Sequence, residues 1–118
     1  MHELGIVYHI IDSLEAVARE NHLTHIDSVT MEVGEVSAVI PEYLTDCWGW
    51  ASKKHALLEG CRMMIETLPA VTHCDGCGVD YPTVAHGRIC PRCGSEKTWL
   101  LRGSEINIKE ISVNEEEA

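Results

Sequence analysis

Two Cys-x-x-Cys pairs constrain this chain more than any other feature of its sequence. The pairs are Cys74 with Cys77 and Cys90 with Cys93, and residues 78–89 separate them. A tetrahedral zinc site needs four soft ligands that converge at about 2.3 Å, and a Cys-x-x-Cys turn directs two sulfurs at one ion. The alternatives are unpaired thiols, disulfides or a redox-active pair, but two pairs with flanking glycines favour a closed, structural zinc site.

The segment that carries these cysteines is too short to fold around a hydrophobic core of its own. Residues 70–97 fall well below the ~40 residues at which a domain usually folds without metal or disulfides. Zinc binding is worth ~10–16 kcal/mol in comparable modules, so the ion would supply most of the stability of this lobe. Four protein ligands leave no open coordination position, so we assign no catalysis to the site.

The rest of the sequence predicts an α+β fold. Apolar residues recur at helical spacing from Leu4 to Ala18, and Pro41 suits the first turn of a second helix. Three segments predict strands, namely "SVTMEVGEVS", whose alternation indicates a half-buried strand, "CRMMIETLPAV" and "SEINIKEISV". We therefore expect two helices on a small three-stranded sheet with an inserted four-cysteine zinc lobe. The expected domains are 1–69, completed by 98–118, and the zinc-binding domain 70–97.

Four smaller features carry expectations of their own. Gly34 should end or kink the first strand. In the third strand the alternation of apolar residues shifts by one position between Ile108 and Ile111, which predicts either a β-bulge or a strand buried on both faces. Cys47 and Cys61 have no partner at ligand spacing, so we expect buried core thiols. The terminal "NEEEA" predicts a frayed acidic tail.

The charge of the chain argues against nucleic-acid binding. Lys and Arg number 9 and Asp and Glu number 19, which gives a net charge of −10. Nucleic-acid binding depends on clustered Lys and Arg that release counterions from phosphates. No basic stretch precedes the first apolar positions, and no run approaches the ~18 apolar residues of a membrane span. We expect a cytoplasmic protein with neither nucleic-acid nor membrane partners.

The first three residues could form a metal chelate. The α-amine of Met1, the amide nitrogen of His2 and the imidazole of His2 can surround one cation, and Ni(II) or Cu(II) favours such a nitrogen-rich planar set. The first amide groups of a helix have no acceptor within it, so those of His2 and Glu3 are available to a metal. The alternative is a solvated histidine beside a Glu3 that only complements the helix dipole.

Several segments together resemble one known family. "MHELGIV" at the N-terminus, "MEVGEVSAV" over Met31–Val39, "EGC" over Glu59–Cys61, and then "CDGC" and "CPRC" are similar to the HypA/HybF hydrogenase maturation proteins. The resemblance covers nearly the whole chain. Its most specific elements are the terminal Met-His-Glu and the four-cysteine lobe in combination.

The resemblance implies a nickel metallochaperone that helps insert nickel into the large subunit of [NiFe]-hydrogenase, alongside a partner GTPase that also supplies nickel. The implied nickel ligands centre on His2 and Glu3 with Met1 beside them, which makes 1–69 a nickel-binding domain. The implied zinc ligands are Cys74, Cys77, Cys90 and Cys93. No general base, nucleophile or phosphate-binding motif is visible, so we expect no enzymatic activity.

Two histidines and two rival functions remain open from the sequence. His73 and His86 could serve as a fourth zinc ligand or as pH-sensitive neighbours, although solvated loop histidines are the simpler interpretation. One rival function is a zinc-ribbon module that recognises nucleic acid or a transcription partner. The other is a structural adaptor whose terminal histidine binds nothing.

Overall fold

A computed structural model describes residues 2–113 of the chain, and of His2 the backbone alone. The expected acidic tail, residues 114–118, lies outside the described residues. The chain forms two compact units. The helical unit holds the residues up to Met31, Val39–Glu66 and those from Asn107 onward, and the cysteine unit holds Glu32–Ala38 and Thr67–Ile106.

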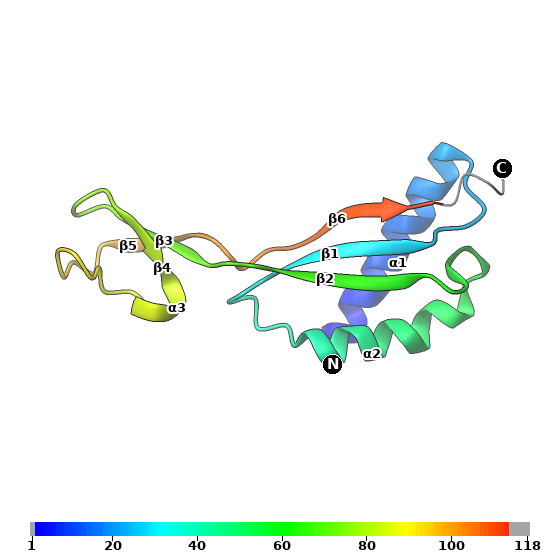
Figure 1. Cartoon of the computed structure of the whole chain (residues 1–118), viewed down its shortest axis with the longest axis horizontal. Helices are drawn as coiled ribbons and strands as arrows, with labels where there is room; N and C mark the ends of the chain where they lie inside the picture. The colour runs from blue at the N-terminus through cyan, green and yellow to red at the C-terminus, as the bar shows by residue number, and fades with distance from the viewer. Residues whose placement is uncertain (1, 114–118) are drawn as a thin grey trace. The chain divides into compact units, whose positions relative to one another are not determined.

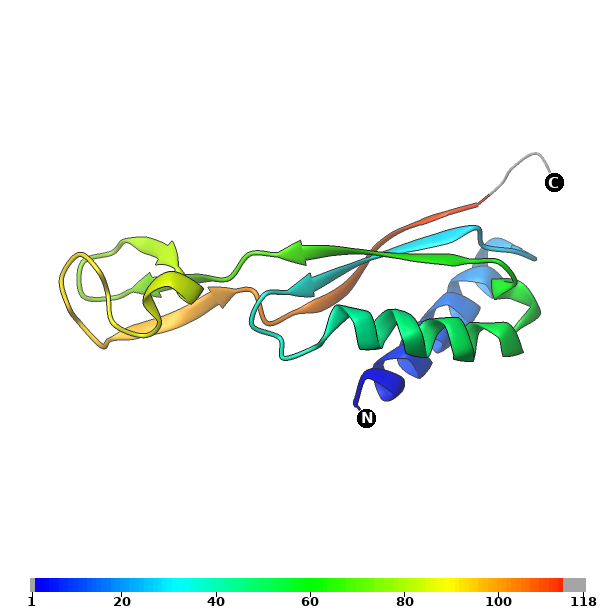
Figure 2. The same cartoon turned by 60° about the horizontal axis from the view of Figure 1, so that its bottom comes forward.

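The elements confirm the α+β class with two main helices (Figure 1). The two long helices are α1 (His2–Asn21) and α2 (Pro41–Ala51), followed by the 3-10 turns η1 (Ser52–Lys54) and η2 (Ala56–Leu58). A three-stranded sheet has the order β2 (Arg62–Leu68), β1 (Ser28–Gly34), β6 (Ile106–Ser112). Figure 2 shows α1 and α2 on the same face of this sheet.

Helix α1 buries one face along most of its length. The buried side chains are Val7, Ile10, Ile11, Leu14 and Ala18, whereas Tyr8 is 42% exposed. The helix ends where His22 takes a left-handed conformation with φ of 56° and the Leu23 N–H donates to the Ala18 carbonyl at 2.9 Å. This hydrogen bond, typical of a helix C-terminus, gives the Ala18 carbonyl a donor that the helix itself does not supply.

Helix α2 begins at the predicted proline, Pro41, and like α1 it buries one face in the hydrophobic core. Leu44, Trp48 and Ala51 are buried on its inner face. The Trp48 Nε1–H donates to the Cys61 carbonyl at 3.0 Å, so the indole is buried without an unpaired donor. Lys53 and Lys54 belong to η1, which follows α2 directly.

Two of the predicted strands differ from expectation in their burial. β1 is the central strand, and six of its seven residues are buried, including Ser28 and Thr30, so the prediction of a half-buried strand was wrong. β6 lies at the edge of the sheet and is mostly exposed, with Ile108 at 37%. Burial of β6 on both faces was therefore also wrong, because both long helices lie on the same face of this sheet (Figure 2) and β6 has no further strand of the described chain beside its outer edge.

The cysteine unit contains a second sheet, which the sequence did not predict. Its order is β4 (Asp80–Pro82), β3 (Val71–Cys74), β5 (Thr98–Arg102), and both pairs are antiparallel. A short helix α3 (Thr83–His86) follows β4. Because β5 pairs with β3, residues 98–106 belong with the cysteines, together with 32–38, whereas the predicted boundaries put both segments with the first domain.

Two glycines bring three segments of the cysteine unit together. β1 ends at Gly34, as predicted, and a Cβ atom there would clash with the Gly103 carbonyl. Gly103 itself has φ of 113°, and a Cβ atom on it would clash with Ala70. The Val36 N–H then donates to the Gly103 carbonyl at 2.9 Å, which fixes residues 34–36 against the turn before β6.

Candidate metal centre

Four cysteine sulfurs converge in the cysteine unit. The Sγ atoms of Cys74, Cys77, Cys90 and Cys93 all lie within 4.8 Å of one another. The Cys74–Cys93 and Cys77–Cys90 Sγ pairs are each 3.6 Å apart. Four thiolates at ~2.3 Å from a tetrahedral zinc ion would stand about 3.8 Å apart, so the cluster fits such an ion.

Each Cys-x-x-Cys pair forms the same backbone turn. In the first, the Gly78 N–H donates to the Cys74 carbonyl at 2.8 Å and the Cys74 N–H donates to the Val79 carbonyl at 2.9 Å. In the second, the Gly94 N–H donates to the Cys90 carbonyl at 2.9 Å and the Cys90 N–H donates to the Ser95 carbonyl at 3.0 Å. Gly78 and Gly94 have φ of 80° and 73°, a conformation that L side chains resist, which explains the predicted glycines.

The cluster is buried on one side and accessible on the other. Cys74 and Cys90 are 0% and 1% exposed and pack with Tyr81, whereas Cys77 is half-buried and Cys93 is exposed. The Tyr81 hydroxyl donates to the Gly87 carbonyl at 2.8 Å, which ties the sulfur cluster to the segment after α3. A metal ion could therefore enter past Cys93.

The four sulfurs differ strongly in acidity. Burial raises the pKa of Cys90, but the backbone N–H groups of Cys93 and Arg92 and neighbouring thiols outweigh it and lower the pKa to about 6. The Ser95 N–H lowers the pKa of Cys93, but partial desolvation beside the other three sulfurs and the hydrogen bonds with those sulfurs raise it to about 12. The Cys90 thiol thus loses its proton readily, and the resulting negative charge makes deprotonation of the neighbouring thiols less favourable. A divalent cation would offset the repulsion between the thiolates.

The two histidines near the cysteines lie outside the sulfur cluster. His73 Nδ1 is 2.6 Å from Asp80 Oδ1, its Nε2 is 3.6 Å from Asp75 Oδ1, and its ring lies 5.4 Å from that of Trp99. His73 is therefore held by neighbours and not a solvated loop residue. His86 is exposed, with its ring 5.9 Å from that of Tyr81 in an edge-on contact. Among the side chains that the structure describes, those of residues 3–113, no other group of three or more potential ligands converges.

The predicted N-terminal site falls only partly within the described residues. Met1 and the side chain of His2 lie outside them, and α1 begins at His2. Glu3 is only 7% exposed, and its Oε2 accepts a hydrogen bond of 3.4 Å from the N–H of Ile40, the N-cap of α2. The Glu3 side chain is buried because its carboxylate lies in the first turn of α1 and meets the N-cap of α2. Nothing local marks a contact between residues 37 positions apart.

The remaining cysteines separate into two environments. Cys61 is buried, and burial raises the pKa of its thiol to about 11, with the Asp27 carboxylate adding to the effect. It is a core thiol, as predicted. Cys47 is only half-buried, so the same prediction was wrong for it.

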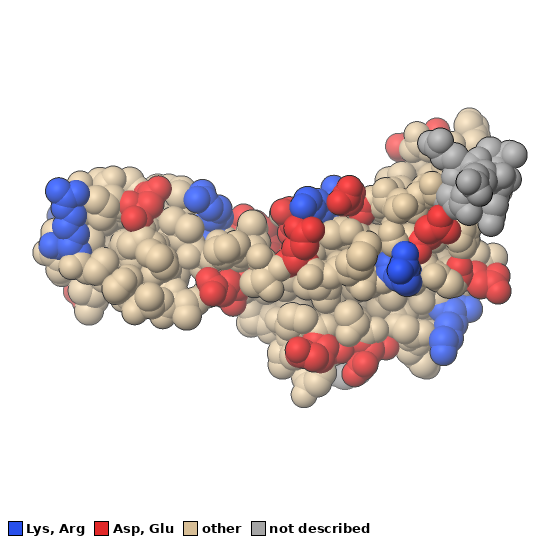
Figure 3. Space-filling view, in the orientation of Figure 1, with Lys and Arg blue, Asp and Glu red and all other residues tan. Residues whose placement is uncertain are grey.

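Two features of the structure concern nucleic acids and membranes as partners: the distribution of basic side chains and the character of the helices. On the face seen in Figure 3, Lys and Arg side chains occur singly or in small groups among acidic ones and form no broad basic surface. Within the part of the chain that the structure describes, none of the helices has the length and apolar character needed to span a bilayer.

Comparisons with known proteins give a consistent result. A family model described as "Hydrogenase/urease nickel incorporation, metallochaperone, hypA" matches residues 1–113. Hydrogenase maturation factor HypA of Chlorobium phaeobacteroides is 35% identical, with 96% of this chain and 99% of that protein covered. The corresponding protein of Geobacter metallireducens is 32% identical over the same shares. The solution structure of the Ni metallochaperone HypA from Helicobacter pylori has a TM-score of 0.72 at 19% identity, covering 93% and 95% of the two chains, and thus shares the fold.

Proposed function

Because this chain belongs to the HypA family of nickel-incorporation metallochaperones, we propose that it assists nickel insertion into the large subunit of a [NiFe]-hydrogenase. In this proposal it carries Ni(II) at its N-terminus as cargo and holds Zn(II) at Cys74, Cys77, Cys90 and Cys93. It acts in the cytoplasm together with a nickel-supplying GTPase. It is a carrier without a catalytic step of its own.

One observation carries the nickel half of the proposal: α1 begins at His2. The amide groups of His2 and Glu3 therefore lie in the first turn, where a helix offers no acceptor for them. They can lose their protons to a metal without breaking the helix. Together with the Met1 amine and the His2 imidazole they supply a nitrogen-rich set that suits planar Ni(II).

The Glu3 side chain has a different role in this proposal. Its carboxylate accepts a hydrogen bond from the Ile40 N–H and is nearly inaccessible to solvent. Glu3 would thus bind nickel through its amide nitrogen while its carboxylate holds the first turn of α1 at the start of α2. The amide nitrogens of His2 and Glu3 would then belong to a helical turn held in place by the contact between Glu3 and Ile40, from which nickel can be handed on.

The zinc half is supported by the chemistry of the sulfur cluster. Four sulfurs at 3.6 to 4.8 Å separation fit the edges of one thiolate tetrahedron. Among the described residues only sulfur atoms converge at this cluster, so its donors are soft and favour zinc over harder cations. When bound, zinc would neutralise the thiolates and hold the two turns together, and these four residues leave no open position for a substrate.

Nickel titration of the untagged chain tests the proposal. Calorimetry should show tight Ni(II) binding that His2→Ala abolishes without changing zinc content or the circular dichroism spectrum. The matched control is His9→Ala, which removes an exposed imidazole elsewhere on α1. An N-terminal extension should weaken binding by converting the amine to an amide. Unchanged affinity in His2→Ala would refute the terminal site and leave the structural-adaptor alternative.

Two further assays separate the remaining alternatives. Urease is the second candidate recipient, because the family description names both enzymes. Hydrogenase and urease maturation in cells that lack their own carrier would distinguish the recipients. A salt-dependent nucleic-acid binding assay tests the zinc-ribbon alternative, for which we expect no binding at physiological ionic strength.

A further inference from the structure

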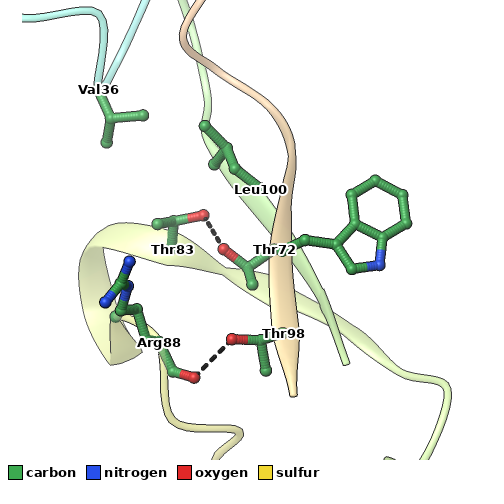
Figure 4. Close-up of a pocket in the computed structure, with 8 residues that line it drawn as sticks. Val36, Thr72, Thr83, Arg88, Thr98 and Leu100 are labelled. Carbon is green, nitrogen blue, oxygen red and sulfur yellow. Dashed lines mark hydrogen bonds between the residues drawn. The ribbon is translucent and has the colours of Figure 1, made fainter. Parts of the chain in front are cut away.

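A pocket opens in the cysteine unit on the side of β3 and β5 that faces α3 (Figure 4). Its volume is about 450 Å³, and none of the four cysteines lines it. Pockets of ~300–1,000 Å³ hold small molecules or the side chains of a bound peptide. The proposed nickel and zinc sites make no use of it.

The pocket has one apolar wall. Val36 and Leu100 line it, and they are 37% and 38% exposed. Leu100 pairs with Thr72 in the β3–β5 register, so the two side chains share one face of the sheet. The bond from Val36 N–H to the Gly103 carbonyl, 2.9 Å long, keeps Val36 in place above them. This wall can contact an aliphatic side chain.

Three threonines add polar groups to the pocket. Thr72 and Thr83 Oγ1 atoms are 2.6 Å apart, and whichever hydroxyl accepts this hydrogen bond keeps its own O–H to donate. The Thr98 hydroxyl donates to the backbone carbonyl of Arg88 at 2.6 Å. That bond, drawn in Figure 4, fixes the backbone from which the Arg88 side chain extends toward Thr83.

Arg88 is the one charged residue among those lining the pocket. Its side chain is exposed, and no described residue forms an ion pair or a hydrogen bond with the guanidinium. The whole chain is strongly acidic, with a net charge of −10, yet residues 83–102 hold four basic residues against a single acidic one, Glu96. The pocket is thus complementary to an anion that carries an apolar group.

We propose that this pocket binds an extended segment of a partner protein in which a carboxylate side chain stands beside an aliphatic one. The carboxylate pairs with the Arg88 guanidinium, which can donate two parallel hydrogen bonds to it. The aliphatic side chain contacts Val36 and Leu100, and the free threonine hydroxyl donates to the segment's backbone. The site is independent of the terminal nickel ligands, so nickel binding and segment binding can fail separately.

Fluorescence anisotropy with the full-length chain tests the proposal. The probe is a fluorescein-labelled hexapeptide, Gly-Leu-Asp-Leu-Gly-Ser, with its Asp→Asn counterpart as the ligand control. Arg88→Gln should lower the affinity about tenfold or more, because it removes the charge-assisted hydrogen bonds to the carboxylate. The matched control is Arg102→Gln, the same charge change on an exposed residue outside the lining, which should stay within about twofold.

Amide and methyl NMR shifts locate the bound probe. They should change at Thr72, Thr83 and Leu100 and stay constant on α1. Three results would overturn the proposal: no binding up to ~1 mM peptide, equal losses in Arg88→Gln and Arg102→Gln, or shifts confined to another surface. A single-stranded oligonucleotide that binds with the same dependence on Arg88, while the peptide does not bind, would identify a nucleic-acid surface instead.

Discussion

Replacing Glu3 separates a structural role of its side chain from metal binding by its backbone. The carboxylate lies in the first turn of α1 and accepts a hydrogen bond from the N-cap of α2, so it faces the positive ends of two helix dipoles. Glu3→Gln keeps an oxygen acceptor but removes the charge. Glu3→Ala removes both.

The expected magnitudes follow from these contacts. A carboxylate at a helix N-terminus contributes ~0.3–1 kcal/mol, so loss of charge at two termini should cost about 1 kcal/mol in Glu3→Gln. Glu3→Ala also deprives the Ile40 N–H of this acceptor, which adds ~1 kcal/mol. The bond is long, at 3.4 Å, which places this contribution at the low end. For a chain of this size we expect Tm to fall by ~4 °C in the Gln variant and ~8 °C in the Ala variant.

Thermal unfolding followed by circular dichroism, with nickel calorimetry on the same preparations, measures both effects. Asp12→Asn, an exposed substitution on α1, serves as the control and should change neither quantity. If the amide nitrogen is the ligand, both Glu3 variants keep their nickel affinity within about threefold at temperatures where they are folded. A tenfold loss of affinity in a folded Glu3→Gln protein would show that the carboxylate itself binds nickel. An unchanged Tm in Glu3→Ala would refute the proposed link to α2.

Three further predictions concern the cysteine unit. Cys74→Ser combined with Cys93→Ser should abolish zinc binding and accelerate amide exchange throughout this unit while α1 stays protected, and zinc retained at one equivalent would exclude the four-cysteine site. Gly34→Ala should destabilise the chain by ~2 kcal/mol, because the new Cβ clashes with the Gly103 carbonyl, whereas Gly49→Ala, which meets no atom within 4 Å, should be neutral or stabilising in chemical denaturation. The N–H groups of Gly103 and Ser104 hold the pKa of Glu105 below its usual value, so the Glu105 carboxylate stabilises the fold above its unfolded-state pKa and this stabilisation is lost as the pH falls through the folded-state pKa. Glu105→Gln should therefore reduce the loss of stability between neutral and acidic pH. An unchanged dependence of stability on pH in this variant would contradict the prediction.

Much of the fold could be predicted because its signals are local. The spacing of Cys74 and Cys77, repeated at Cys90 and Cys93, requires two tight turns, and the following glycines supply the left-handed backbone that each turn needs. The helical period of α1 and the proline at the start of α2 likewise depend only on neighbours within a few positions. Where a prediction needed to know which strand lies beside which, it failed. The alternation in β1 suggested one buried face, and only its central place between β2 and β6 explains why Ser28 and Thr30 are buried.

The sequence by itself determined the four-cysteine turns, the positions of the two main helices and the class of the fold, since each depends on residue types at short, fixed spacing. The tertiary structure alone decided that the Glu3 carboxylate meets the start of α2, that β5 joins β3 next to the cysteines, and that Val36, Thr83, Arg88 and Leu100 line one pocket. These contacts join residues far apart along the chain, and their partners are selected by the packing of whole elements, which no local pattern of residues encodes.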